Sequence, residues 1–244
     1  MMAEEAGEPK ESAASVAIAA TLLGAITFQM LLFYFLNHSD PDMRRYSYEA
    51  VSSTISIFCS VLLFQSFNDI IEAWLFTDAS LEYQLLVDGV NFLFWYIVLQ
   101  LTLAVTSGAI SELIGQPQIE KEQIEANMKC YAVLLAHITG FASINFWSGM
   151  QQLPWFRSSP SRSLLTLPIA VCAQFLLMEL STHVRRLIAL CDDGEVDENE
   201  EMWEEETAES ENDVMGLTLS FQTVQVVRFT IGGTMPNQEG EEPW

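Results

Sequence analysis

Lysine and arginine are scarce in this chain. They number 10 among 244 residues, against 33 aspartates and glutamates, so the formal net charge at pH 7 is -23. Proteins that bind nucleic acid need clustered basic side chains to neutralise the phosphates. The composition therefore excludes nucleic acid as an expected partner.

Cysteine and histidine are also few, with four and three residues. The cysteines form no Cys-x-x-Cys pair, and an isolated cysteine commonly packs as a small apolar side chain. His137 and His183 are the candidates for binding haem or a metal ion, but two histidines without a paired motif favour structural hydrogen bonds. We predict no cofactor and no metal site, and keep a membrane haem or metal protein as the third alternative for the function.

The short motifs that assemble a catalytic site are missing as well. The sequence contains no HExxH, no GxSxG and no P-loop. No motif in the sequence pairs a nucleophilic side chain with a general base. This absence favours a protein that is not an enzyme.

Long apolar runs, by contrast, are abundant, and 50% of the residues are hydrophobic. A run of about 20 apolar residues spans the roughly 30 Å hydrocarbon core as a helix, which satisfies its own backbone hydrogen bonds. The predicted fold is therefore all-α, a polytopic membrane helix bundle with about six transmembrane helices surrounded by the lipid bilayer. The expected spans are residues 13–36, 51–67, 85–106, 130–150, 164–180 and 214–231.

The fifth and sixth runs are separated by a strongly acidic segment in which 13 of the 22 residues 192–213 are Asp or Glu. Such a composition repels itself and is typical of disorder. A lone Met202-Trp203 pair within it suggests a docking contact for a basic partner. The predicted organisation is an acidic tail (1–12), five transmembrane helices (13–190), an acidic disordered loop (191–213), a sixth helix (214–235) and a polar tail (236–244).

Basic residues near the span ends predict the orientation, because they favour the inner side of a membrane. Loops one, three and five share one side and carry six of them: Arg44, Arg45, Lys121, Lys129, Arg185 and Arg186. The other side carries three: Lys10, Arg157 and Arg162. We therefore expect both termini outside and the acidic segment 191–213 inside.

Four charged residues within the runs support the main functional hypothesis, because an ionisable group at membrane depth is costly. Asp69 and Glu72 share a helical face at the outer end of the second span. Asp88 begins the third span, and Arg228 lies at a similar depth in the sixth. We predict that Arg228 pairs with at least one of the three acids. Such a pair either fixes helix packing or forms part of a gate or cation site.

A polar intramembrane core is the second candidate feature. His137 and Asn145 share one face of the fourth span, and Gln222 and Gln225 share one face of the sixth. Polar side chains at this depth face protein or water, so they either line a pore or form interhelical hydrogen bonds. The favoured function is transport or ion permeation, with a cation as the candidate substrate. The alternative is a non-catalytic structural or assembly subunit that has other membrane subunits as partners.

Overall fold

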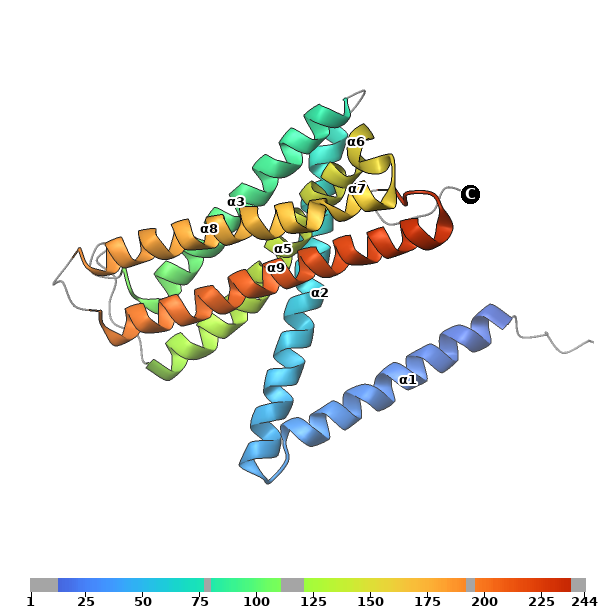
Figure 1. The fold of residues 1–244 in the computed structure, drawn as a ribbon. Helices are drawn as coiled ribbons and strands as arrows, with labels where there is room; N and C mark the ends of the chain where they lie inside the picture. The colour runs from blue at the N-terminus through green and yellow to red at the C-terminus, as the bar shows by residue number, and fades with distance from the viewer. Residues whose placement is uncertain (1–12, 77–79, 111–120, 192–195, 238–244) are drawn as a thin grey trace, which may run out of the picture. The chain divides into compact units, whose positions relative to one another are not determined.

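The computed structural model describes residues 13–76, 80–110, 121–191 and 196–237. All the regular elements among these residues are α-helices (Figure 1), which confirms the predicted all-α fold. The helices are α1 (Ala13–Leu36), α2 (Pro41–Leu75), α3 (Leu81–Ser107), α5 (Lys121–Gln152), α6 (Pro154–Arg157), α7 (Pro160–Leu164), α8 (Thr166–Ala189) and α9 (Glu198–Gly232).

Among the residues that the structure describes, six helical segments are long and apolar enough to cross a membrane. They are Ser15–Leu36, Pro41–Leu75, Leu81–Ser107, Asn127–Gln152, Pro160–Ala189 and Glu198–Gly232. The chain is therefore an integral, multi-pass membrane protein, as the apolar runs predict. The expected acidic tail 1–12 lies outside the described residues, as does the part of the expected C-terminal tail from residue 238.

The chain divides into two compact units, Met1–Thr54 and Ile55–Trp244, and the division falls within α2. In the first unit, α1 satisfies its polar side chains locally. The hydroxyl of Thr21, for example, donates to the backbone carbonyl of Ala17 at 2.9 Å. Hydrogen bonds of this kind allow threonine to occur in an apolar helix at membrane depth.

In the second unit, α5 is the central helix and packs against both α3 and α9. The interior of this unit contains completely buried apolar side chains from two of these helices: Leu99 and Leu103 of α3, and Met128 and Ala136 of α5. α8 packs along α9, and the two helices run side by side (Figure 1). Polar side chains that these helices contribute inward consequently meet one another rather than lipid.

The acidic segment before the sixth span is helical from Glu198 onward, so the prediction of a disordered loop over residues 191–213 is wrong there. α9 runs without a break over Glu198–Gly232. The Asp197 carboxylate accepts from the backbone N–H of Glu200 at 2.8 Å, and the Glu200 carboxylate accepts from that of Asp197 at 2.9 Å. This reciprocal capping box starts the helix. Residues 192–195 lie outside the described part of the chain.

A buried stripe explains why this acidic stretch folds. Trp203, Thr207, Glu211 and Val214 are all buried, and their spacing of four, four and three places them on one helical face. Trp203 joins the core cluster that contains Met128 of α5. Because Trp203 is 3% exposed, it packs within the protein's own fold and does not offer a docking contact for a basic partner.

The length of α9 determines where its acidic half lies. A helix of 35 residues is roughly 52 Å long, whereas the hydrocarbon core is roughly 30 Å thick. The apolar second half fills that thickness, so the acidic first half extends beyond it. The acids on its outer faces are therefore solvated while the buried stripe packs on α3, α5 and α8.

Candidate functional site

Three of the four predicted charged residues line a single cavity of about 900 Å³. Asp69 and Glu72 come from the end of α2, and Asp88 comes from the start of α3, so both helix ends face the same side of the membrane. Asp69 and Glu72 are exposed, whereas Asp88 is only 2% exposed. Four amide side chains complete the polar lining: Gln65, Asn68, Gln84 and Asn145.

Asn145 connects α5 to this acidic cavity. Its Nδ2 donates to Asn68 Oδ1 at 3.2 Å, and Asn68 Nδ2 donates to Glu72 Oε1 at 2.5 Å. The chain of hydrogen bonds holds the Glu72 carboxylate in place. The structure therefore joins Asn145, which was predicted as part of a separate polar core, to the predicted acids.

Arg228, the fourth predicted charged residue, lies on a different helix from the three acids. It lies on α9 with a partly exposed side chain, and it is not among the described residues that line the cavity. Its pairing with Asp69, Glu72 or Asp88 stays a prediction. The structure brings the three carboxylates to the lining of one cavity.

The charge on the cavity wall has one sign. Among the described residues that line it, none is lysine, arginine or histidine. A cleft lined by one sign of charge within walls of low dielectric attracts and concentrates counter-ions. No group of three His, Cys, Asp or Glu within the described residues is arranged to hold a metal ion directly.

Gln222 and Gln225 of the predicted polar core lie apart from the acidic cavity, packed in the interior at 0% and 1% exposure. Gln151 of α5 donates from Nε2 to the backbone carbonyl of Gln222 at 3.4 Å. Gln225 donates from Nε2 to the carbonyl of Asn237 at 3.3 Å. These contacts link α5, α9 and the segment that follows α9. The Gln222 side-chain amide itself has no hydrogen-bond partner within the described residues.

The two candidate haem or metal ligands occupy ordinary helical positions. The Nδ1 atom of His137 lies 2.8 Å from the carbonyl oxygen of Val133, one turn earlier on α5. His183 is exposed on α8. For His137, local bonding of this kind is the structural role that an isolated histidine favours.

A second charged group, which the sequence pattern did not single out, lies toward the opposite end of α3. Arg185 near the end of α8 and Glu211 on α9 form an ion pair, with 3.0 Å between Nη1 and Oε1 and side chains that are 3% and 1% exposed. Glu204 of α9 binds the same guanidinium, with 2.7 Å between Nε and Oε2.

Polar groups of α3 complete this buried network. The Tyr96 hydroxyl donates to Glu211 Oε1 at 2.5 Å, and Gln100 Nε2 donates to the same oxygen at 2.7 Å. Gln100 Oε1 accepts from Arg185 Nη1 at 3.0 Å. Buried charges are tolerated when they are paired and hydrogen-bonded, so the network fastens α3, α8 and α9 together.

The two charged features lie at different ends of α3. Asp88 and Gln100 are separated along α3 by about 18 Å at the usual helical rise, with the acidic cavity at one end and the ion-pair network at the other. No protein-family model, curated protein sequence or solved structure matches this chain. The function must therefore be inferred from the chemistry of these residues.

Proposed function

We propose that the protein is a membrane transport or ion-permeation protein that takes up a cation in the acidic cavity. The observation that supports this proposal is the convergence of Asp69, Glu72 and Asp88 on one cavity of about 900 Å³. Three carboxylates on one wall lower the free energy of a cation between them and raise its local concentration. An acid at membrane depth is also a functional-site hypothesis by default.

The differing exposure of the acids suggests an order of contact. Asp69 and Glu72 are exposed and meet the cation first, whereas Asp88 is almost fully buried and forms the inner end of the site. The amide groups of Asn68 and Asn145 lie between α2 and α5 and offer neutral polar contacts. A partly hydrated cation would exchange water for these side chains as it moves inward.

The proposed orientation places the acidic cavity outside and the ion-pair network inside. The ends of α8 and α9 that carry the network belong to the side with more basic residues near the spans, which favours the inner side. Both termini would then lie outside. This orientation makes the cavity an entrance for external cations.

The test is a cation flux assay on purified protein in liposomes, with Na⁺, K⁺ and Ca²⁺ supplied separately. Asp88→Asn removes one charge, worth about 2 kcal/mol to a cation roughly 7 Å away at an effective dielectric of about 20. The flux should therefore fall at least about tenfold. Glu179→Gln is the matched control, because Glu179 is exposed on α8 and does not line the cavity. Equal flux in the two variants would contradict the proposal.

A non-catalytic structural or assembly subunit is the second candidate. The almost completely buried Arg185–Glu211 pair favours it, since this pair fixes α8 against α9. Wild-type protein that carries no cation in the liposome assay, yet co-purifies in fixed stoichiometry with another membrane protein, would support this candidate over transport.

A further inference from the structure

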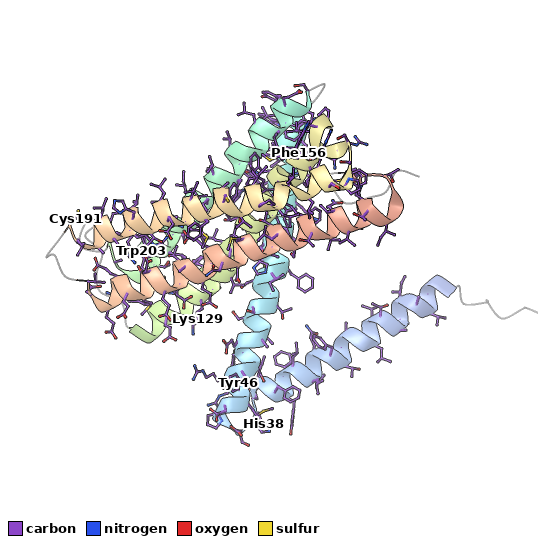
Figure 2. The ribbon with its side chains drawn as sticks, in the orientation of Figure 1. His38, Tyr46, Lys129, Phe156, Cys191 and Trp203 are labelled. Atoms are coloured by element: carbon purple, nitrogen blue, oxygen red, sulfur yellow. The ribbon has the colours of Figure 1, made fainter. Side chains whose placement is uncertain are left out.

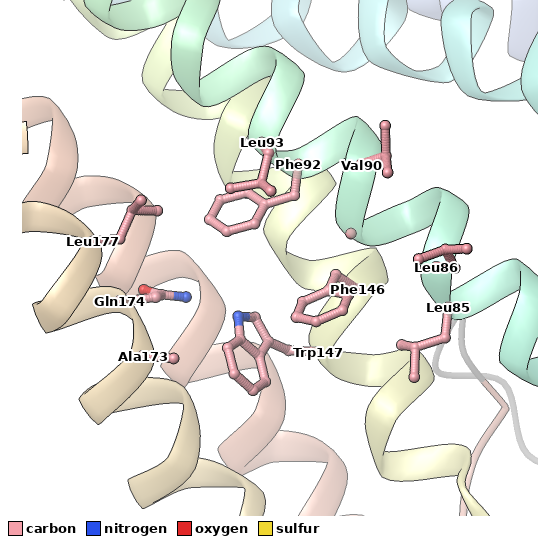
Figure 3. Close-up of a pocket in the computed structure, with 11 residues that line it drawn as sticks. Leu85, Leu86, Val90, Phe92, Leu93, Phe146, Trp147, Ala173, Gln174 and Leu177 are labelled. Carbon is pink, nitrogen blue, oxygen red and sulfur yellow. The ribbon is translucent and has the colours of Figure 1, made fainter. Parts of the chain in front are cut away.

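A groove separate from the acidic cavity lies among α3, α5 and α8 and has a volume of about 370 Å³ (Figure 3). It shares no lining residue with the acidic cavity. Leu86, Val90 and Leu93 form its α3 wall and are 64%, 62% and 47% exposed. Since these side chains lie on a membrane-spanning helix, the groove opens toward the hydrocarbon of the bilayer.

Two polar side chains line this otherwise apolar groove. Trp147 of α5 and Gln174 of α8 are 3% and 4% exposed. Trp147 Nε1 and Gln174 Oε1 have no hydrogen-bond partner within the described part of the chain. Figure 3 shows the indole nitrogen turned toward the side of the groove where Gln174 lies. Buried polar atoms are rarely left unpaired, because each one costs free energy.

The other half of the Gln174 amide is already engaged. Gln174 Nε2 donates to Ser143 Oγ at 3.0 Å, and Ser143 Oγ is 2.8 Å from Thr218 Oγ1. Thr218 Oγ1 is also 2.8 Å from the carbonyl oxygen of Val214. A hydroxyl has one proton, so Thr218 can donate to Val214 while Ser143 donates to Thr218. The Gln174 Oε1 atom is then left over as an acceptor.

One unmet donor and one unmet acceptor in an apolar groove define the ligand by its chemistry. A hydroxyl group both accepts and donates, whereas an ether only accepts and an alkane does neither. We propose that the groove binds a membrane-dissolved molecule with an apolar body and one hydroxyl group. The hydroxyl accepts from Trp147 Nε1 and donates to Gln174 Oε1. The volume lies within the range of about 300–1,000 Å³ of small-molecule sites.

The test uses the whole protein in nanodiscs of dioleoylphosphatidylcholine. The probe is 1-hexadecanol with a diazirine in the middle of its chain, and cross-linked residues are mapped by mass spectrometry. Unlabelled 1-hexadecanol, hexadecyl methyl ether and hexadecane compete with the probe. We expect the ether to compete about fivefold more weakly than the alcohol and hexadecane more weakly again, because each hydrogen bond contributes about that factor. Equal competition by the three compounds would overturn the proposal.

Variants separate a specific site from general lipid contact. Ala173→Leu fills the groove from an exposed position of α8, and Cys172→Leu is its neighbour outside the lining. Labelling should fall at least about tenfold in the first variant and persist in the second, with unchanged thermal unfolding of both. Trp147→Phe removes one of the two hydrogen bonds to the hydroxyl. The ratio by which 1-hexadecanol competes better than hexadecane should therefore fall about fivefold. Equal labelling of the two leucine variants would refute the site. The readout does not depend on cation flux.

Discussion

Arg185 and Glu211, 26 residues apart in the chain, meet in an ion pair that is almost completely excluded from solvent. Arg185→Met leaves the Glu211 carboxylate buried without its counter-charge. Breaking a buried pair from one side costs about 3–5 kcal/mol, and the free energy of unfolding in detergent should fall by that amount. Titration with sodium dodecyl sulfate, followed by tryptophan fluorescence, measures it.

The control for this substitution is the Lys129–Glu125 pair, whose side chains are 49% and 54% exposed. Lys129→Met should change the free energy of unfolding by less than about 1 kcal/mol, since exposed pairs contribute little. The combined Arg185→Met and Glu211→Leu variant should be more stable than Arg185→Met alone, because it leaves no unpaired charge in this pair. A double variant that is less stable than the single would contradict the assignment.

The start of α9 gives a second prediction. Asp197→Ala removes the side chain that caps Glu200, which costs about 1 kcal/mol of helix stability. Hydrogen–deuterium exchange of the first turn should accelerate, while Trp203, buried in the core, stays protected. Asp213→Ala is the matched control, because it removes the same charge from an exposed position within α9. Fast exchange throughout residues 198–213 of the wild type would instead support the prediction that this segment is a disordered loop.

The six spans could be predicted from hydropathy because a bilayer imposes a length and a composition on each crossing helix. The acidic half of α9 was missed because its charge outweighs every other local signal. Two signals were nevertheless present. Asp197 and Glu200 have the spacing of a capping box, and Trp203, Thr207, Glu211 and Val214 continue a helical period into the apolar run.

The candidate site was predictable only in part. Asp69 and Glu72 share a turn of one helix, and Asp88 follows shortly in the chain, so sequence order alone brings the three acids to one side. Arg185 and Glu211 come from different helices, and their meeting depends on how α8 and α9 pack. The hydrogen bond from Asn145 to Asn68 likewise requires the tertiary arrangement of α5 and α2.

Gly140 of α5 lies against Leu217 of α9 and gives a third prediction. A Cβ atom at this position would lie 2.6 Å from Cδ1 and 3.4 Å from Cβ of Leu217. Gly140→Ala should lower the free energy of unfolding by about 1 kcal/mol, because overpacking costs more than the helix propensity gained.

Gly216 is the matched control for Gly140, because a Cβ there meets nothing within 4 Å. Gly216→Ala should stabilise the protein by about 0.5–1 kcal/mol. Adding Leu217→Ala to Gly140→Ala should give a favourable coupling energy in a double-mutant cycle. Additive effects would mean that the two side chains do not touch.

The orientation gives the fourth prediction, and cysteine labelling decides it. All four cysteines are exposed, but Cys191 follows the end of α8 whereas Cys172 lies within the membrane-spanning part of α8. In single-cysteine variants, a membrane-impermeant maleimide should label Cys191 only after the cells are permeabilised. Cys172 should remain unlabelled in both conditions, because a charged, membrane-impermeant reagent does not enter the hydrocarbon of the bilayer.

Labelling of Cys191 in intact cells would reverse the orientation and place the acidic half of α9 outside. The acidic cavity would then open to the interior, and Asp69 and Glu72 would meet internal cations first. The side from which liposomes accept cations must agree with the labelling result, since Cys191 at the α8–α9 end and the cavity at the α2–α3 end lie on opposite sides of the membrane. Disagreement between the two measurements would argue against the cavity as the entrance, whichever way the chain crosses the membrane.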